Sequence, residues 1–410
     1  MAHVRRRAEE IVNAALADTR VVIVNGARQV GKSTLVHVVT RERPNVIERR
    51  LDRPSDLQAA RRDPETFVVH DHLMVIDEVQ RAPEIMLPIK ARVDEDDRPG
   101  QFLLTGSARV LGLRALPDAL VGRTETVELW PFSQGEIEGC REHFIDDLFA
   151  DQFDGSAAGT TPREEYIERA LRGGFPEATK RIDGRRQRFF ASYVNDLIDR
   201  DVTQLQDIKR RSDLDRVIRV LAGRMATLVN ISNVSTHVGI PKTSLERYLA
   251  LFEEVFLIKR ISSWSSSDTA RAVHMRKLFF VDSGLAAHLS GRSAAKLQRE
   301  PVLAGQLLEN FVLAELARQL TWSDLQVSLH HYRNRDGVEV DAVLESNDGR
   351  VVGVEVKASS TVDATDFRAL AHLERLSTRQ FMRGVVLYTG DRVLPFGPKL
   401  LALPIDALWS

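Results

Sequence analysis

The run VVIVNGARQVGKSTLV, residues 21–36, constrains the fold of this chain more than any other stretch. Its residues match the pattern G-x-x-x-x-G-K-[ST] of a phosphate-binding loop, preceded by an apolar strand and followed by a helix. The glycines allow backbone N–H groups to turn towards phosphate oxygens, Lys32 reaches the terminal phosphates, and the Ser33 hydroxyl ligates Mg²⁺. The following residues are therefore expected to contact a nucleotide: Gly26, Ala27, Arg28, Gln29, Val30, Gly31, Lys32, Ser33 and Thr34.

Short apolar runs alternate with helical or irregular stretches in the first third of the chain. The expected strands are RVVIVNG, NVIERRLD, HLMVIDE and QFLLTGS. Such alternation is typical of a parallel sheet covered by helices on both faces. The sequence therefore predicts an α/β nucleotide-binding fold.

The run LMVIDEVQ, residues 73–80, ends its apolar part in Asp77 and Glu78. An acid at the end of a strand beside the phosphate loop can hold Mg²⁺, and a second acid can activate an attacking water. This pairing favours hydrolysis over transfer of the phosphate to an acceptor. The next strand ends in Thr105 and Ser107, and we expect Ser107 to sense the γ-phosphate, although a helix N-cap would use the same residue types.

Arg123, in LVGRTETVELWPFS, is the candidate for the arginine that neutralises charge during hydrolysis, and Arg109 is a weaker competitor. The chain lacks the Asn-Lys-x-Asp motif of guanine-specific sites, so ATP is expected in preference to GTP. If Arg123 acted on the site of a neighbouring copy, the protein would have to form an oligomer. The sequence leaves open whether Arg123 acts on the site of its own chain or on that of a neighbouring copy.

The rest of the composition restricts the cellular compartment and the binding partners that we expect for the chain. A single cysteine, Cys140, excludes a disulfide framework and a cysteine-based zinc site within one chain. No apolar run approaches the roughly 18 residues of a membrane span, and the N-terminus reads as an amphipathic helix, so a cytoplasmic protein without a membrane partner is expected. The net charge of −1 means that any contact with nucleic acid must come from a local patch.

Changes in pattern along the chain predict four parts. They are an ATPase core at 1–130, a helical lid or bundle at 131–212, a winged-helix-like domain at 213–292 and a nuclease-like domain at 293–410. Residues 146–162 are expected to form a mobile loop because they are acidic and then rich in Gly, Ala and Thr.

Residues 230–262 suggest two helices joined by a short turn at Gly239, followed by a β ribbon. This order describes a winged helix. DNA contact and protein–protein contact both remain open, because the second helix also carries glutamates. The residues expected to contact DNA are Lys242, Thr243, Arg247, Lys259, Arg260, Arg276 and Lys277.

Two alternating runs, VEVDAVLE and RVVGVEVKAS, flank Asn347-Asp348-Gly349 and predict a β-hairpin. If the loop closes over residues 346–350, Asp341 lies opposite Glu355, and Lys357 shares the face of Glu355. Asp followed by Glu-x-Lys on the next strand is the constellation of metal-dependent phosphodiester cleavage, with Mg²⁺ or Mn²⁺ on the acids. Glu309, on a largely apolar helix, would complete the set. The same pattern also fits an exposed Glu–Lys pair on a sheet.

Taken together, the chain resembles the bacterial and archaeal AAA-type ATPases in which an AAA_14 domain precedes a DUF4143 domain. The matching segments include GARQVGKST, MVIDEVQRAPE, FLLTGSAR, LVGRTETVELWPFSQGE, FFVDSGLAAHLSG, LLENFVLAEL and GVEVDAVL…VGVEVKAS. The resemblance implies an ATP-binding domain, a winged helix and a domain similar to PD-(D/E)xK nucleases. It carries the ATP-site roles onto Gly31, Lys32, Ser33, Asp77 and Glu78, and the nuclease-type roles onto Glu309, Asp341, Glu355 and Lys357.

One departure is Ala27, where the family often has proline, but this side chain does not contact phosphate. The sequence thus predicts a Mg²⁺-dependent ATPase whose nucleotide state controls a nucleic-acid-binding or nuclease-like C-terminal half. The alternative is an ATP-dependent switch in which an inactive nuclease fold docks a protein partner.

Overall fold

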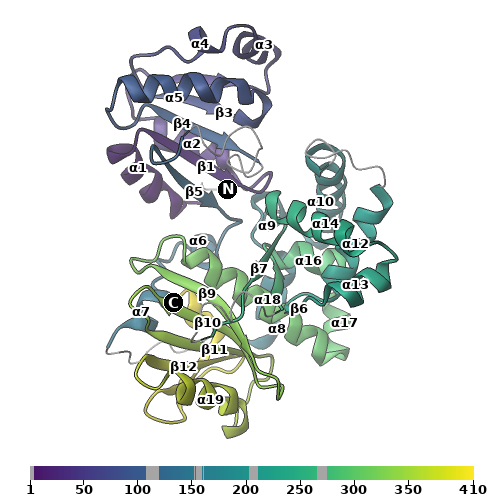
Figure 1. Cartoon of the computed structure of the whole chain (residues 1–410). Helices are drawn as coiled ribbons and strands as arrows, with labels where there is room; N and C mark the ends of the chain where they lie inside the picture. Colours follow the sequence, from purple (N-terminus) through teal and green to yellow (C-terminus); the bar gives the residue numbers. More distant parts are fainter. Residues whose placement is uncertain are drawn as a thin grey trace. The chain divides into compact units, whose positions relative to one another are not determined.

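The computed structural model describes residues 4–107, 120–151, 153, 159, 161–202, 211–265 and 275–410 (Figure 1). The chain divides into two compact units, one that ends at Phe132 and also takes in Glu254–Phe256, and one formed by Ser133–Glu253 and Leu257–Ser410. Among the described residues, no helix combines the length and the apolar character that a membrane crossing requires.

A five-stranded parallel sheet forms the centre of the first unit, with strand order β2-β3-β4-β1-β5. The strands are β1 (Val21–Gly26), β2 (Ile47–Arg50), β3 (Met74–Asp77), β4 (Phe102–Gly106) and β5 (Thr124–Leu129). β1, β3 and β4 are buried along their whole length, as expected of a sheet covered on both faces. The expected P-loop α/β fold is therefore confirmed.

The sequence did not predict the fifth strand, because Thr124, Glu125 and Thr126 are polar and Val127 begins the only clear apolar alternation. Pairing with β1 decides its conformation, from Val21 opposite Thr124 to Gly26 opposite Leu129. The helices of this unit are α1 (Ala8–Asp18), α2 (Lys32–Thr40), α3 (Pro54–Arg62), α4 (Pro64–Phe67) and α5 (Met86–Glu95).

The second unit begins with a set of helices. They are α6 (Gln134–Glu138), α7 (Phe144–Phe149), α8 (Arg163–Arg172), α9 (Pro176–Thr179), α10 (Asp183–Asp196), a π-helical turn at Leu197–Val202, and α12 (Arg211–Gly223). α7 overlaps the start of the expected loop at 146–162, because Phe144, Ile145, Leu148 and Phe149 form one buried face. Much of the rest of that loop lies outside the described residues.

A small antiparallel sheet with strand order β6-β8-β7 follows. It consists of β6 (Thr227–Leu228), β7 (Ile258–Ile261) and β8 (Lys277–Phe280). Between β6 and β7 lie α13 (Ile231–Val238) and α14 (Lys242–Glu254), separated by Gly239 in the left-handed conformation. β8 is fully buried, including the side chain of Lys277.

The C-terminal part is a six-stranded mixed sheet with order β13-β14-β12-β11-β10-β9, and Figure 1 labels β9 to β12. Its strands are β9 (Val327–Arg333), β10 (Glu339–Ser346), β11 (Val351–Lys357), β12 (Phe381–Tyr388), β13 (Leu394–Pro395) and β14 (Leu400–Pro404). The long buried helix α18 (Pro301–Gln319) contacts β11 and β8, and α19 (Arg368–Ser377) packs on β10, β11 and β12. Two short helices, α16 (Ser283–Leu289) and α17 (Ala294–Arg299), connect β8 to α18.

Candidate functional site

The phosphate loop joins β1 to α2, as the motif requires. Gly26 has φ 157°, and a Cβ there would lie 2.2 Å from the carbonyl oxygen of Leu129. Gly31 has φ 100° and immediately precedes α2, so the N-terminal N–H groups of that helix face the loop. The Lys32 ammonium donates to the carbonyl oxygens of Gly26 (3.0 Å) and Ala27 (2.9 Å). The loop is therefore folded around its own lysine.

Ser33 and Asp77 meet although 44 positions separate them in sequence. The Ser33 hydroxyl lies 3.0 Å from Oδ2 of Asp77. The Thr105 hydroxyl donates to the other oxygen, Oδ1. Because β4 lies between β1 and β3, its polar end is next to both. A hydroxyl beside a carboxylate at the mouth of a phosphate loop is the ligand set that Mg²⁺ takes with a nucleotide, so these residues fit the expected ion.

Glu78 has a left-handed backbone conformation, with φ 60° and ψ 45°. Such a conformation costs a residue with a Cβ about 1 kcal/mol or more, and it recurs at functional sites. Its N–H donates to the Thr105 hydroxyl (3.2 Å), while its carboxylate accepts from the Gln80 amide (2.5 Å). The Ser107 hydroxyl accepts a second hydrogen bond from Gln80 (3.1 Å).

Gln80 is part of the run LMVIDEVQ, but nothing in that pattern assigns it a role. The reason lies in the left-handed turn at Glu78, which carries Gln80 back over the acid. The Oε1 atom of Gln80 is buried without a partner among the described residues, beside the carboxylate that would activate water.

Arg6 is a second residue that the sequence did not single out. Its guanidinium donates to the carbonyl of Val30 in the phosphate loop (3.0 Å) and to the carbonyl of Trp130 (2.5 Å). It also stacks on Phe132, 4.6 Å from the ring centroid. Arg6 thus ties the loop to the segment that follows β5, the last segment of the first unit.

Arg123 lies at the end of the parallel strands that is opposite to the phosphate loop. The Val21 N–H, at the start of β1, donates to the Arg123 carbonyl, and the Arg123 side chain pairs with Asp94 on α5. Five further residues of β1 lead to the loop, roughly 17 Å away. The geometry therefore does not support a role for Arg123 in the site of its own chain, and a role in a neighbouring copy stays a prediction. Arg109 lies outside the described residues.

In the C-terminal domain the predicted hairpin forms with the predicted register. Ala342 pairs with Val354 and Glu345 with Val351, so Asp341 and Glu355 face each other on adjacent strands. Lys357 lies 3.4 Å from Oε2 of Glu355 and 3.8 Å from Asp366. Glu355 is only 6% exposed.

The Lys277 ammonium lies among the acids that were expected to bind metal. It forms ion pairs with Oδ1 of Asp341 (3.0 Å), with Oε1 of Glu339 (3.4 Å) and, closer still, with Glu309. The other oxygen of Asp341 accepts the Val356 N–H (3.0 Å). Among the described residues, no group of three or more acids, histidines or cysteines is arranged to hold a metal ion. Lys277 is therefore not available to DNA, contrary to the expectation from sequence.

Charge and burial together shift the pKa values of the acids in this cluster. Burial first, and Asp341 second, raise the pKa of Glu309 well above its usual range despite the nearby ammonium. Burial also raises the pKa of Glu355. For Asp341 burial acts upwards as well, but Lys277 and the Val356 N–H outweigh it and lower the pKa. The central ion pair is therefore Lys277 with Asp341.

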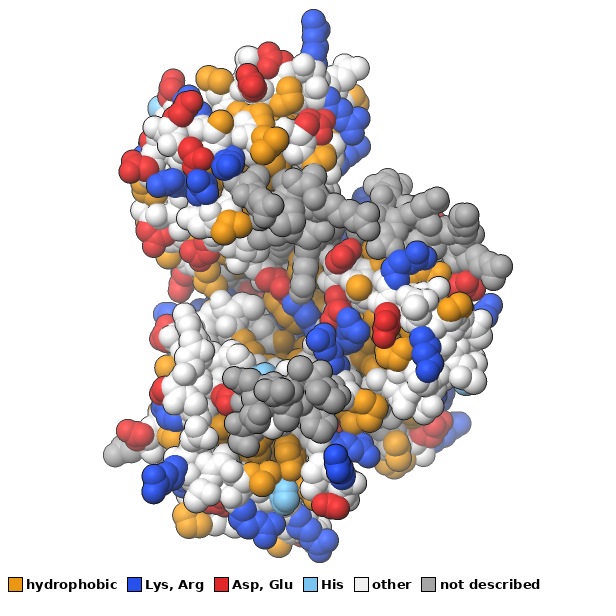
Figure 2. Space-filling view, in the orientation of Figure 1, with side chains coloured by type: hydrophobic (Ala, Val, Ile, Leu, Met, Phe, Trp, Pro, Cys, Tyr) orange, Lys and Arg blue, Asp and Glu red, His pale blue; other side chains and the backbone are white. Residues whose placement is uncertain are grey.

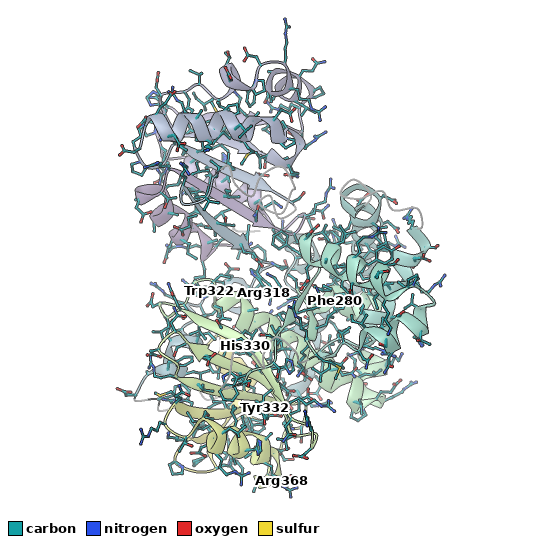
Figure 3. The ribbon with its side chains drawn as sticks, viewed as in Figure 1. Phe280, Arg318, Trp322, His330, Tyr332 and Arg368 are labelled. Atoms are coloured by element: carbon teal, nitrogen blue, oxygen red, sulfur yellow. The ribbon has the colours of Figure 1, made fainter. Side chains whose placement is uncertain are left out.

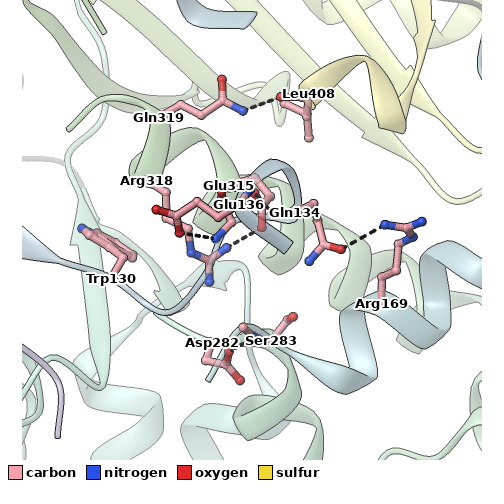
Figure 4. Close-up of polar contacts among 12 residues, drawn as sticks. Trp130, Gln134, Glu136, Arg169, Asp282, Ser283, Glu315, Arg318, Gln319 and Leu408 are labelled. Carbon is pink, nitrogen blue, oxygen red and sulfur yellow. Dashed lines mark hydrogen bonds and ion pairs between the residues drawn. The ribbon is translucent and has the colours of Figure 1, made fainter. Parts of the chain in front are cut away.

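A second buried polar cluster fixes the start of the second unit (Figure 4). The Gln134 N–H, at the start of α6, donates to Oε2 of Glu315 on α18 (3.2 Å), and Glu315 pairs with Arg318 (2.6 Å). Glu142 accepts from the Ser133 hydroxyl (3.0 Å) and the Gly135 N–H (2.9 Å). Burial first, and Glu315 second, raise the pKa of the Glu142 carboxyl to about 8.

Comparison with known families agrees with the site geometry. A model described as an AAA domain matches residues 18–138, and two models of domains of unknown function, DUF8612 and DUF4143, match residues 163–296 and 304–408. The chain therefore combines an AAA domain with a C-terminal DUF4143 domain. The AAA match contains the phosphate loop, Asp77 and Glu78, and the DUF4143 match contains Glu309, Asp341 and Glu355.

Relatives of this AAA–DUF4143 chain include an uncharacterized protein of Mycobacterium tuberculosis, 27% identical over 98% of this chain and 84% of its own length. A Haemophilus influenzae protein is 26% identical over 53% of this chain and 51% of its own. Among solved structures, the Walker-type ATPase PABY2304 of Pyrococcus abyssi has a TM-score of 0.42 at 16% identity, covering 70% of this chain and 96% of that one. The RuvB Holliday junction branch migration motor of Thermotoga maritima has a TM-score of 0.31 at 13% identity, covering 63% and 90%.

Proposed function

We propose that the first unit binds ATP with Mg²⁺ and hydrolyses it. The observation that carries this proposal is the contact between Ser33 and Asp77, at the end of a loop in which Lys32 is directed inwards. When bound, Mg²⁺ supplies charge neutralisation on the phosphate oxygens. Lys32 would leave the carbonyls of Gly26 and Ala27 for the terminal phosphates, and the N–H groups that begin α2 would bind the anion.

Glu78 acts on the water in this proposal. The water oxygen bonds to the γ-phosphorus, the bond from that phosphorus to the bridging oxygen of ADP breaks, and the water proton passes to the Glu78 carboxylate. Gln80 and Ser107 hold that carboxylate in place. Ser107 directly follows β4, and in this proposal its hydroxyl also senses whether the γ-phosphate is present.

The test separates binding from turnover. Lys32→Ala should lose ATP binding by equilibrium dialysis, whereas Glu78→Gln should bind ATP as the wild type does and hydrolyse it about 100-fold or more slowly. Lys90→Ala and Glu95→Gln, which remove a lysine and an exposed glutamate on α5, are matched controls. If Lys32→Ala and Glu78→Gln matched the wild type, the proposed site would be wrong.

We further infer that the nucleotide state reaches the second unit through the segment that joins the units. Arg6 connects the phosphate loop to Trp130, and a few residues later Gln134 is held on α18 by Glu315. In this proposal a shift of the loop on ATP binding changes the position of α6. Hydrogen exchange of residues 133–138 should differ between the ADP-bound chain and the ATP-bound Glu78→Gln variant, and equal exchange would contradict the coupling.

For the C-terminal half, the position of Lys277 favours the alternative in which a nuclease-like fold serves as a docking surface and not as a cutting site.

Acidic and basic side chains of the described residues are interspersed on the face in Figure 2, so a contact with nucleic acid would be local. The helix pair α13–α14 and the β7–β8 strands keep the order of a winged helix, and four of the expected contacts are exposed: Lys242, Thr243, Arg247 and Arg276. Retention of duplex DNA at low salt that Lys242→Ala and Arg247→Ala weaken would support DNA as the partner. Failure of the wild type to retain DNA would favour a protein partner.

A further inference from the structure

The cluster around Lys277 gathers carboxylates, the kind of group that binds divalent cations, around the ammonium group of a lysine. Glu309 lies on α18, Glu339 and Asp341 share one face of β10, and Lys277 enters from β8. Carboxylate oxygens from several elements directed at one point are what Mg²⁺ or Mn²⁺ requires. Here the point is occupied by an ammonium group of the same chain.

Acidic groups of three residues surround the Lys277 ammonium. It forms ion pairs with Glu309, Glu339 and Asp341, and it donates hydrogen bonds to Oδ1 (3.0 Å) and to the backbone carbonyl (3.4 Å) of Asp341. Asp341 uses one oxygen for Lys277 and the other for the Val356 N–H. Glu355 remains beside them with its Oε1 buried and without a partner among the described residues, the position of a ligand to a missing charge.

The strand that carries Lys277 is fixed on α18 by further contacts. Asn310 accepts from the Phe280 N–H (2.8 Å) and donates to the Phe280 carbonyl (3.0 Å). Arg318 donates to the carbonyl of Val281 (2.9 Å). Figure 3 marks Phe280 and Arg318 on these two segments. Because β8 is attached to α18 at successive points, the backbone that carries Lys277 is held beside the acids.

We propose that Lys277 is a built-in cation that fills the acidic site of the DUF4143 domain and excludes divalent metal from it, so that removing the lysine opens a metal site formed by Glu309, Glu339, Asp341 and Glu355. A buried charge whose partner is removed is strongly unfavourable, and a metal ion is the natural replacement for the lost ammonium. The native chain therefore does not cut nucleic acid by metal-dependent chemistry at this site. This inference is independent of ATP hydrolysis in the first unit.

The experiment uses the full chain without nucleotide and follows free Mn²⁺ by electron paramagnetic resonance. The wild type and its Asp341→Asn variant should bind the same amount of Mn²⁺, because the acidic site is closed in both. Lys277→Met, which keeps the volume of the side chain, should bind about one Mn²⁺ per chain, and adding Asp341→Asn should abolish that binding. Lys399→Met, which removes a lysine that donates to the Phe381 carbonyl on the far strands of the same sheet, should behave as the wild type.

Stability gives a second readout. The thermal midpoint of Lys277→Met should be lower than that of the wild type without metal and should rise on addition of Mn²⁺, while the wild-type midpoint stays constant. If Lys277→Met does not fold alone, refolding in Mn²⁺ should recover it. Three results would overturn the proposal: wild-type Mn²⁺ binding that depends on Asp341, a folded Lys277→Met that binds no Mn²⁺, or an unfolded Lys277→Met that Mn²⁺ does not recover.

Discussion

The Gln80 amide donates a 2.5 Å hydrogen bond to the Glu78 carboxylate, two residues before it on the same turn. The left-handed backbone of Glu78 brings the two side chains together, and Ser107 on the neighbouring strand holds the amide from the other side (3.1 Å). A base that must accept a proton from one water molecule gains from being held in one orientation. Gln80 is therefore a positioning residue for Glu78.

Replacing Gln80 with Met keeps the length of the side chain and removes the amide. We expect turnover of ATP to fall about 10- to 100-fold, because misplacing a catalytic group by an ångström has effects of this size. The dissociation constant of ATP should stay within about twofold, since the hydrogen bonds of Gln80 among the described residues go to Glu78 and Ser107 and not to the phosphate loop. Steady-state ATPase assays and equilibrium dialysis measure the two quantities. An unchanged rate, or a loss of binding that matches the loss of rate, would show that Gln80 does not position the base.

Arg6→Gln should loosen the phosphate loop from the end of β5. The guanidinium holds the carbonyls of Val30 and Trp130 together, and a glutamine amide can reach only one of them. We expect ATP affinity to fall about tenfold, by about 1.5 kcal/mol for a lost hydrogen bond from a charged donor. The comparison is with Arg5→Gln, whose side chain is exposed and pairs with Glu10, and which should bind ATP as the wild type does.

The sequence predicted those parts of the fold that depend on local pattern. The phosphate loop, the Asp77–Glu78 strand and the register of the β10–β11 hairpin all follow from motifs or from strict alternation within short segments. The polar strand β5 was missed because its conformation comes from pairing with β1.

The partner of Lys277 could not be predicted for a different reason. The lysine begins the buried run Lys277–Phe280, and a lysine at the end of an apolar strand reads equally well as a surface cation. Its acidic partners lie on α18 and β10, more than 30 residues later in the chain. The same holds for Arg123, whose location at the end of the strands away from the phosphate loop depends on the direction of β5, a strand that the pattern did not reveal.

If Arg123 acts on the site of a neighbouring copy, its loss should be complemented by mixing. Arg123→Ala and Lys32→Ala should each be slow alone, and a mixture should regain part of the wild-type turnover, because an intact Lys32 site can then meet an intact Arg123. The ATPase rate at several mixing ratios measures this effect. No recovery, together with normal turnover of Arg123→Ala alone, would remove Arg123 from the catalytic residues.

The raised pKa of Glu142 should make the stability of the second unit depend on pH. An acid with a folded-state pKa of about 8 and an ordinary value of 4.5 keeps its proton more firmly when folded, so stability is highest below about pH 4.5 and falls as the pH rises through that window to about 8. Glu142→Gln removes this titration and can keep the hydrogen bond from the Gly135 N–H. The variant should gain stability over the wild type at pH 9 relative to pH 5, by up to about 4 kcal/mol, because about three pH units of that window lie above pH 5 at roughly 1.4 kcal/mol each. Urea unfolding of both proteins at the two pH values measures the difference, and Glu138→Gln, which changes an exposed acid at the C-terminal end of α6, is the control. An equal difference at both pH values would mean that Glu142 is ionised in the folded chain.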